Sequence, residues 1–213
     1  MNIIIFGPPG AGKGTQAQYL VNKYKYFQIS TGDLLRNETK NNTKLGKKIL
    51  ELINKGKFVS DEIVNTLLNK EITKPAKRNK IVFDGYPRNI TQAKNLDKLI
   101  KADNQVIGSI IYLNVSKELI NKRISGRVVC EKCNNIFNEF EDSGKLINHK
   151  CEKKFLKKRT DDDIKVFIKR YETYIEQTKP ILDYYSSSPI FNEVDGNKKI
   201  EEITSKIDQI ITV

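Results

Sequence analysis

Cysteine and histidine are scarce in this sequence, which has three cysteines and one histidine among 213 residues. Three cysteines cannot pair off internally, and in a reducing compartment clustered Cys and His side chains more often bind metal than form disulfides. Long apolar runs are also missing, since none approaches the roughly 18–20 residues of a membrane span. The opening "MNIIIFG" lacks the basic flank and cleavage site of a signal peptide. These absences predict a cytoplasmic protein without a membrane partner.

Arginine is the rarer of the two strong bases, because only seven of the 38 basic residues are arginines. These seven are Arg36, Arg78, Arg88, Arg123, Arg127, Arg159 and Arg170. The lysines are spread over many segments without a dense basic block, so the net charge of +12 is weak evidence for a nucleic-acid partner. A chain that uses lysine by default is expected to keep arginine where a planar, bidentate donor to phosphate or carboxylate is needed.

Short apolar runs rich in β-branched residues indicate four buried strands, at residues 2–6, 80–85, 109–115 and 189–196. Segments whose apolar residues recur at helical spacing separate these strands, and Ser60 and Ser116 are candidate N-caps of two such helices. Two later helices are expected to bury the faces Ile164, Phe167, Ile168, Tyr171, Ile175 and Ile200, Ile203, Ile207, Ile210. Alternating strands and helices predict an α/β fold with a parallel sheet covered on both faces. Residues 128–158 break this rhythm and are interpreted as an insertion.

The first predicted strand leads into the glycine-rich stretch "GPPGAGKGT" (7–15). Gly7, four further residues, Gly12 and Lys13 have the Walker A spacing, in the strand-to-helix context that this motif requires. Its glycines let backbone N–H groups turn toward phosphate oxygens, while the helix N-terminus and Lys13 add positive charge. Gly14 occupies the position where the motif usually has a hydroxyl residue that binds magnesium, so Thr15 or a water would have to bind the ion instead. The stretch predicts a site for nucleotide phosphates.

Two further stretches narrow the reaction, because the chain lacks the Asn-Lys-x-Asp and Asp-x-x-Gly signatures of a GTPase. "STGDLLR" (30–36) is expected at a helix start. "FDGYPRN" (83–89) ends a strand, where Asp84 could hold magnesium through water and Arg88 lies close by. These side chains extend the expected phosphate site beyond the glycine-rich loop.

The stretches "GPPGAGKGT", "STGDLLR", "DGYPRNITQA", "RISGR", "RTDDD" and "FNEVDG" follow one another over essentially the whole chain. In content and order they resemble the motifs of the adenylate kinase family, in its form with a long lid. The resemblance implies a P-loop three-layer α/β/α core (1–29, 60–126 and 160–213), an inserted AMP-binding helical segment (30–59) and a lid (127–159). Every arginine except Arg78 lies in or next to these motifs, which favours a phosphate-binding role for the other six.

The resemblance further implies an enzyme that catalyses ATP + AMP ⇌ 2 ADP with magnesium, as a monomer that binds no nucleic acid. Its ATP site would comprise Gly10, Ala11, Gly12, Lys13, Gly14, Thr15, Arg123, Arg127, Ile136, Phe137 and Lys198. Its AMP site would comprise Thr31, Arg36, Lys57, Phe58, Val59, Gly85, Tyr86, Pro87, Arg88, Gln92, Arg159 and Arg170. The expected catalytic residues are Lys13, Arg88, Arg123, Arg159 and Arg170, with Asp84 for magnesium and Asp161 and Asp162 for holding the closed lid.

This reaction requires positioning and charge neutralisation more than covalent help. No general base is needed when the phosphate of AMP is the nucleophile, in agreement with a chain whose only histidine lies in the insertion. Lid closure would exclude water, the unwanted acceptor.

The cysteines lie in the segment that resembles the lid, where the family often has a structural zinc with four ligands. Cys130, Cys133 and Cys151 match three ligand positions, but Lys154 occupies the fourth, and an ammonium group cannot bind zinc. His149 is the natural substitute, because a neutral imidazole suits tetrahedral zinc. The alternative is a metal-free lid that keeps its cysteines.

Two other functions stay open from the sequence. One is a different nucleoside monophosphate kinase, with GTP as donor or a pyrimidine monophosphate as acceptor, although the long lid disfavours the short-lid pyrimidine kinases. The other is a zinc-bearing P-loop protein that binds nucleic acid, with the strong salt dependence of such binding. That second function leaves the ordered arginine motifs unexplained.

Overall fold

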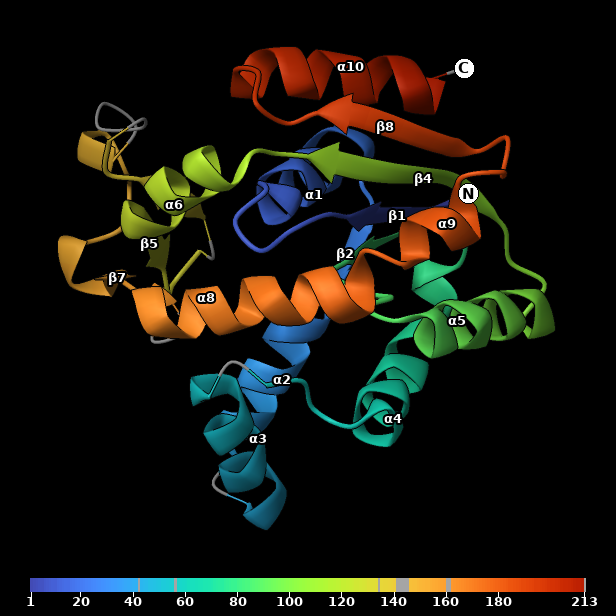
Figure 1. The fold of residues 1–213 in the computed structure, drawn as a ribbon, viewed down its shortest axis with the longest axis horizontal. Helices are drawn as coiled ribbons and strands as arrows, with labels where there is room; N and C mark the ends of the chain where they lie inside the picture. The colour runs from blue at the N-terminus through green and yellow to red at the C-terminus, as the bar shows by residue number, and fades with distance from the viewer. Residues whose placement is uncertain (42, 56, 134, 141–145, 160–161, 213) are drawn as a thin grey trace.

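The computed structural model describes residues 1–41, 43–55, 57–133, 135–140, 146–159 and 162–212. Its central sheet has five parallel strands in the order β2-β3-β1-β4-β8 (Figure 1). The strands are β1 (Asn2–Phe6), β2 (Phe27–Ser30), β3 (Ile81–Asp84), β4 (Ile107–Asn114) and β8 (Phe191–Asp195). The four predicted strands are confirmed. The sequence did not predict β2, which lies at the sheet edge and buries only Ile29 fully.

Helices cover both faces of this sheet, as predicted, because successive side chains of a strand point to opposite faces. Ile4 and Phe6 of β1 belong to one apolar cluster, and Ile3 and Ile5 belong to another. The first cluster includes α4 (Asp61–Ile72), α5 (Ile90–Ala102) and α9 (Ile181–Tyr185). The second includes α1 (Lys13–Tyr24), α6 (Lys117–Ser125) and α10 (Ile200–Thr212). The result is a three-layer α/β/α arrangement.

Two additions extend from the layers (Figure 1). After β2 the chain forms α2 (Thr31–Lys40) and α3 (Lys44–Asn54), which project away from the sheet. After α6 it forms a separate antiparallel sheet, here called the lid sheet: β5 (Arg127–Cys130), β6 (Ile136–Asn138) and β7 (Leu156–Lys157) in the order β6-β5-β7. Two short 3₁₀ turns, η1 (Pro75–Lys77) and η2 (Lys153–Phe155), precede β3 and β7. The predicted insertion is thus a small sheet of its own. Within the described residues, no helix has the length and apolar character to span a membrane.

The two predicted serine caps differ in outcome. The Ser116 hydroxyl accepts a hydrogen bond from Leu119 N at 3.4 Å and caps α6. Ser60 is the N-cap residue of α4, as predicted, but its side chain makes no capping hydrogen bond.

The expected apolar face of the helix beginning at Ile164 is also wrong in part. The segment is α8 (Ile164–Thr173), which continues into the π-helical turn η4 (Tyr174–Thr178). Phe167 is buried, whereas Ile164 is 69% exposed and Ile168 and Ile175 are also exposed. The reason is that α8 runs past the central sheet toward β7 (Figure 1), so that much of it has no sheet to cover. The face predicted for α10 is confirmed, since Ile203 and Ile207 are buried in the core.

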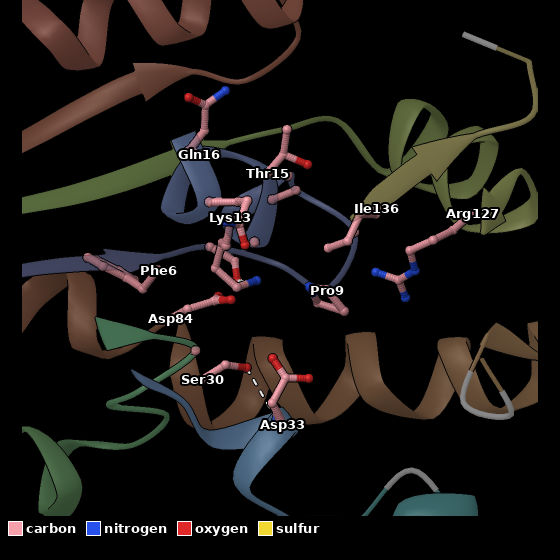
Figure 2. A pocket seen from close by; sticks show the side chains of 18 of the residues that line it. Phe6, Pro9, Lys13, Thr15, Gln16, Ser30, Asp33, Asp84, Arg127 and Ile136 are labelled. Carbon is pink, nitrogen blue, oxygen red and sulfur yellow. Dashed lines mark hydrogen bonds between the residues drawn. The ribbon is translucent and has the colours of Figure 1, made fainter. Parts of the chain in front are cut away.

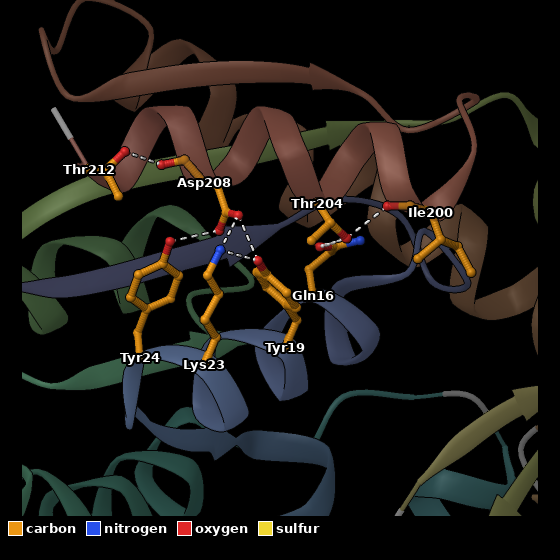
Figure 3. A network of polar contacts seen from close by, with 8 residues as sticks. All are labelled: Gln16, Tyr19, Lys23, Tyr24, Ile200, Thr204, Asp208 and Thr212. Atoms are coloured by element: carbon orange, nitrogen blue, oxygen red, sulfur yellow. Dashed lines mark hydrogen bonds and ion pairs between the residues drawn. The ribbon is translucent and has the colours of Figure 1, made fainter.

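Asp208 ties α10 to α1 (Figure 3). Its carboxylate accepts hydrogen bonds from Tyr19 Oη at 2.6 Å, Lys23 Nζ at 2.6 Å and Tyr24 Oη at 3.0 Å. Because α1 starts directly at the glycine-rich loop, this contact fixes the helix that carries the loop against the C-terminal helix.

Replacing Asp208 by asparagine is expected to lower the free energy of unfolding by about 1 kcal/mol, a value kept small because the ion pair is partly exposed to solvent. Burial alone would raise the pKa of Asp208, but Lys23, Tyr19 and Tyr24 outweigh it and hold that pKa below 3.8. The stabilisation is therefore present above pH 3.8 and is lost as the pH falls through the lower pKa of the folded state. Urea denaturation of both proteins across this pH range tests the prediction; a difference that does not vary with pH would contradict it.

Candidate active site

A cavity of about 560 Å³ opens where the carboxyl ends of β1 and β3 meet α2, α8, α10 and the lid sheet. This edge of a parallel sheet is where α/β proteins usually bind their ligands. In Figure 2, Lys13 and Asp84 point into the cavity from the sheet side. Arg127 and Ile136 approach it from the lid sheet, and Asp33 approaches it from α2. The cavity therefore joins the three parts that the sequence analysis expected to carry the chemistry.

The glycine-rich loop forms one wall of this cavity, from Gly10 to Thr15. Gly10 has φ +83°, and an added Cβ would lie 2.9 Å from side-chain atoms of Ile120 and Ile124, so glycine is required there. A Cβ at Gly14 would lie 3.1 Å from Ile136 Cδ1 and 3.4 Å from Asp84 Oδ2. The lid sheet and Asp84 therefore both approach the loop at position 14.

Lys13 lies in the middle of the loop, where its amine donates hydrogen bonds to Gly7 O at 2.9 Å and Pro8 O at 2.8 Å. Burial lowers the pKa of Lys13 to about 7, and the cations Arg88, Arg170 and Arg127 act in the same direction against the attraction of Asp84. Burial also disfavours the charged form of Asp84 and therefore raises the pKa of this carboxyl. Asp84 Oδ2 accepts a hydrogen bond from Gln28 Nε2 at 2.9 Å. Several positive groups around one carboxylate make the cavity suited to a polyanion.

Binding of a nucleoside triphosphate is expected to take up a proton on Lys13. The amine is partly neutral above pH 7 in the free protein, and phosphate oxygens nearby would raise its pKa again. Affinity should therefore decrease as the pH rises above 7, until the pKa of the complex is reached. Calorimetric titration with ATP at about pH 8, in two buffers that differ in ionisation enthalpy, measures the number of protons exchanged. Equal heats in both buffers would contradict the expectation.

The opposite wall contains most of the residues expected to bind AMP. Arg36, Lys57, Phe58, Val59, Gly85, Pro87 and Arg88 all line the cavity. The Arg88 guanidinium donates from Nε to Gly85 O at 2.7 Å and lies 5.4 Å from the centre of the Phe58 ring. Arg36 Nη2 donates to Asp33 Oδ1 at 2.5 Å. Burial would raise the pKa of Asp33, but Arg36 and Arg159 outweigh it and lower that pKa.

Three residues expected in this site do not line the cavity. Thr31 Oγ1 donates to Gly85 O at 2.9 Å, and Gln92 Oε1 accepts from Arg88 N at 2.7 Å. Tyr86 is fully buried, and its hydroxyl donates to Asn65 at 2.8 Å. Thr31 and Gln92 thus bond the backbone of the turn from Gly85 to Arg88, and the buried Tyr86 side chain anchors the same turn from within.

The lid side of the cavity is lined by Arg123, Arg127, Ile136 and Phe137. Arg159, which follows β7, and Arg170 of α8 line the cavity as well. Arg123 Nη1 lies 3.5 Å from Ala11 O of the glycine-rich loop. Arg127 forms a two-bond ion pair with Asp162, with its Nε 2.8 Å from Asp162 Oδ2. Asp161, the other residue expected to hold the lid closed, is outside the described residues. Lys198 does not line the cavity, whereas Ile200 beyond it does.

Several cavity residues were not predicted to act there. Gln28 lies on β2, whose low apolar content hid it, and Gln16, Tyr19 and Thr204 lie on α1 and α10. The sequence signal that could have found Gln16 and Tyr19 is their position, directly after the glycine-rich loop and about one helical turn beyond it. For Thr204 the sequence carries no comparable signal, because its place depends on how α10 packs.

The three cysteines and the histidine come together outside the cavity. One ligand atom from each of Cys130, Cys133, His149 and Cys151 can be chosen so that all four lie within 4.8 Å of one another. Cys133 Sγ and His149 Nε2 are 3.6 Å apart. Burial alone would raise the pKa of the Cys130 thiol, but hydrogen bonds from His149 and from the backbone of Cys133 and Lys132 outweigh it and lower that pKa to about 6. Burial and the neighbouring thiols raise the pKa of Cys151 to about 11.

The fold and the cavity together define a nucleotide-binding protein of the P-loop class. A family model described as adenylate kinase matches residues 5–190. The chain is 54% identical over 213 residues to the adenylate kinase of Pelagibacter ubique, with both chains covered completely. It is 40% identical to the adenylate kinase of Mycoplasma capricolum, with 97% of each chain covered, and 37% identical to that of Caldanaerobacter subterraneus, with 99% and 96% covered. The chain belongs to the adenylate kinase family.

Proposed function

We propose that this protein catalyses the reversible transfer of a phosphoryl group, ATP + AMP ⇌ 2 ADP, with magnesium. One observation carries the proposal: six of the seven arginines line a single cavity together with Lys13. The seventh, Arg78, lies outside it and donates from Nη2 to Asp103 O at 2.6 Å. Two facing phosphate groups with a metaphosphate-like group between them require such a concentration of positive charge.

Each wall of the cavity has its own role in this proposal. The loop from Gly10 to Thr15 holds the ATP phosphates, with Arg123, Arg127, Ile136, Phe137 and the backbone near Lys198 on the rest of the donor side. Arg36, Arg88 and the residues around Gly85 and Phe58 hold AMP, supported from behind by Thr31, Tyr86 and Gln92. Lys13, Arg88, Arg123, Arg159 and Arg170 neutralise the charge of the transferring group. Magnesium, which accompanies the nucleotide, supplies further charge neutralisation, and Asp84 is placed to hold it through water.

We assign these roles to three parts of the chain: a core (1–29, 60–126 and 160–213), an AMP-binding segment (30–59) and a lid (127–159). The Arg127–Asp162 ion pair joins the lid sheet to the segment before α8 and supports a role in holding the lid. Closure would exclude water from the reacting phosphates. One chain supplies every wall, which supports a monomer, and a thiol cluster suits the reducing conditions of the cytoplasm.

Initial rates of ADP formation with AMP, CMP and UMP as acceptors, and with ATP and GTP as donors, test this function. We expect the ATP and AMP pair to react fastest. Faster phosphorylation of a pyrimidine monophosphate, or preferred use of GTP, would instead support another nucleoside monophosphate kinase. Binding of RNA or DNA that weakens steeply with salt, without phosphoryl transfer, would support the nucleic-acid alternative.

We also propose a structural zinc ion held by Cys130, Cys133, His149 and Cys151. The four residues fit the ion, because tetrahedral zinc takes Cys and His ligands at about 2.0–2.3 Å, which places ligand atoms roughly 3.5–4 Å apart. His149 supplies the fourth ligand that Lys154 cannot. The Lys154 amine instead pairs with Glu152 at 2.8 Å. Zinc there would brace the lid sheet without taking part in the reaction.

Removing the zinc is expected to lower the melting temperature by about 3–6 °C and to leave the core fold intact, because the ion fixes only the lid. Elemental analysis of protein purified without chelator gives the metal content, and thermal unfolding with and without chelator gives the shift. His149→Ala should lose the zinc, whereas Lys154→Ala, the matched control, should keep it. An unchanged melting curve in protein shown to contain zinc would contradict a stabilising ion.

A further inference from the structure

The helix α8 changes its hydrogen-bond pattern where it passes the cavity. From the lid sheet it crosses the molecule toward α9 (Figure 1) and continues into η4, where Lys179 N donates to Tyr174 O at 2.8 Å, five residues back instead of four. Arg170 of α8 and both Tyr174 and Thr178 of η4 line the cavity. Single π-helical turns within longer helices often lie at functional sites, and this one forms part of the cavity wall.

Thr178 is the residue of this turn that bonds a distant part of the chain. A helical threonine usually donates its hydroxyl proton to the carbonyl one turn earlier, as Thr173 does to Lys169 O at 2.7 Å. Thr178 Oγ1 instead donates to Arg88 O, 90 residues away, at 2.8 Å. A hydroxyl has one proton, so the bond to Arg88 takes the place of the usual bond within the helix. Thr178 is buried, so water does not readily replace its hydroxyl as a donor.

The bond from Thr178 holds the carbonyl side of Arg88, while other residues of the same turn hold the rest of this arginine. Arg88 N donates to Gln92 Oε1 at 2.7 Å, and Arg88 Nε donates to Gly85 O at 2.7 Å. Those two bonds lie within one segment of the chain, whereas the bond to Thr178 joins that segment to η4. Loss of the Thr178 hydroxyl would therefore loosen Arg88 relative to η4 without breaking the bonds of the turn itself.

Arg88 and Arg170 act at the same place in the cavity, although they come from different elements. Burial lowers the pKa of Lys13 to about 7, and the charges of Arg88 and Arg170 both act in the same direction. Arg170 lies about two turns before Thr178 on one continuous helical segment. Groups that act on one reacting centre need a constant spacing, since a misplacement of about 1 Å can cost about 10²-fold in rate. The bond from Thr178 to Arg88 connects the two elements that carry these arginines.

We propose that Thr178 is a positioning residue for Arg88, because it fixes the backbone of this arginine against the helix that carries Arg170. The inference rests on the proposed function, since it takes Arg88 as the arginine that binds the phosphate of AMP. Thr178 acts through Arg88 and not on the substrate itself. Its loss should therefore affect the use of AMP, and only while the Arg88 guanidinium is present.

The substitutions Thr178→Val and Thr178→Ser separate the hydroxyl from the rest of the side chain. Valine keeps the branched shape without a proton donor, whereas serine keeps the donor without the methyl group. At saturating ATP, Thr178→Val should lower kcat/KM for AMP about five- to tenfold, the effect of one lost hydrogen bond, and at saturating AMP it should leave the KM for ATP unchanged. Thr178→Ser should recover most of the loss. A merely structural role would not distinguish the two nucleotides.

Thr173→Val is the matched control, because the Thr173 hydroxyl makes the ordinary helical bond and the residue does not line the cavity. This variant should keep the wild-type KM for both nucleotides. A double-mutant cycle tests whether Thr178 acts through Arg88: when Thr178→Val is added to Arg88→Met, kcat/KM for AMP should fall no further. Should Thr178→Val fold poorly in thermal unfolding, Thr178→Ala and Thr178→Ser give the same comparison, since both lack the methyl group and only serine keeps the donor.

The inference is overturned if the variants without the hydroxyl keep the wild-type kcat/KM for AMP, or if Thr178→Ser loses as much as they do. Losses that add in the double variant, or an equal rise in the KM for AMP and the KM for ATP, would also overturn it. All these outcomes leave the proposed function in place, because the wild-type protein would still transfer a phosphoryl group from ATP to AMP. Failure of the wild-type protein to phosphorylate AMP would overturn the proposed function itself, and the role of Thr178 with it.

Discussion

Replacing Lys13 by methionine is expected to lower kcat/KM for ATP by about 10³-fold, because the loss of one preorganised positive donor in a catalytic site typically costs two to three orders of magnitude. The Lys13 amine lies inside the glycine-rich loop, bonded to Gly7 O and Pro8 O. Methionine has a similar length and no charge, so the transferring group would lose this donor while the apolar contacts of the side chain remain. Steady-state rates at saturating AMP measure the effect.

Lys23→Met is the matched control for this substitution. Lys23 lies on the same helix, but its amine is exposed and pairs with Asp208 outside the cavity. We expect this variant to be less stable and to keep nearly wild-type rates. If Lys13→Met retained more than about a tenth of the wild-type kcat/KM, the phosphate role of Lys13 would be refuted. Thermal unfolding of both variants shows whether a lost rate reflects a lost fold.

The sequence predicted the core of the fold because its central strands are buried on both sides. Strands such as β1 read as continuous apolar runs, which are recognisable without any knowledge of their neighbours. Both edge strands bury a single residue, Ile29 in β2 and Val194 in β8, so their apolar signal is weak. The strand β8 was predicted with the help of the Gly-bearing turn that follows it, whereas β2 runs directly into α2. The exposed isoleucines of α8 show the opposite failure: helical spacing predicts a buried face, but only packing decides what lies against it.

The sequence likewise predicted most residues of the cavity, but not which of them line it and which support those that do. Motif positions named Thr31 and Gln92 as site residues, and the structure places both behind the turn that they support. Gln16 and Thr204 line the cavity but were not predicted there. They lie on helices far apart in the sequence and meet only because α10 packs on α1. Spacing within one element can be read from a sequence, whereas contacts between distant elements depend on the tertiary fold.

Replacing Arg88 by methionine is expected to lower kcat/KM for AMP by about 10²- to 10³-fold. Arg88 is held in place from several directions: its Nε donates to Gly85 O, its backbone N–H donates to Gln92, and its guanidinium lies near the Phe58 ring. A guanidinium held this rigidly loses little entropy when it binds a phosphate. We therefore expect Arg88→Lys to recover only a small part of the activity, because an ammonium group cannot form the planar two-bond contact.

Arg78→Met is the matched control for Arg88, because Arg78 is the arginine outside the cavity. Its loss should leave both kcat and the KM for AMP unchanged. The KM for ATP should also differ little between Arg88→Met and wild type, since Arg88 lies on the wall opposite the glycine-rich loop. An equal rise in the KM for AMP and the KM for ATP would indicate general damage to the cavity, and an Arg88→Met protein with a normal kcat/KM for AMP would remove Arg88 from the acceptor site. The two arginines thus test the central argument, that a chain rich in lysine keeps arginine where phosphate must be held.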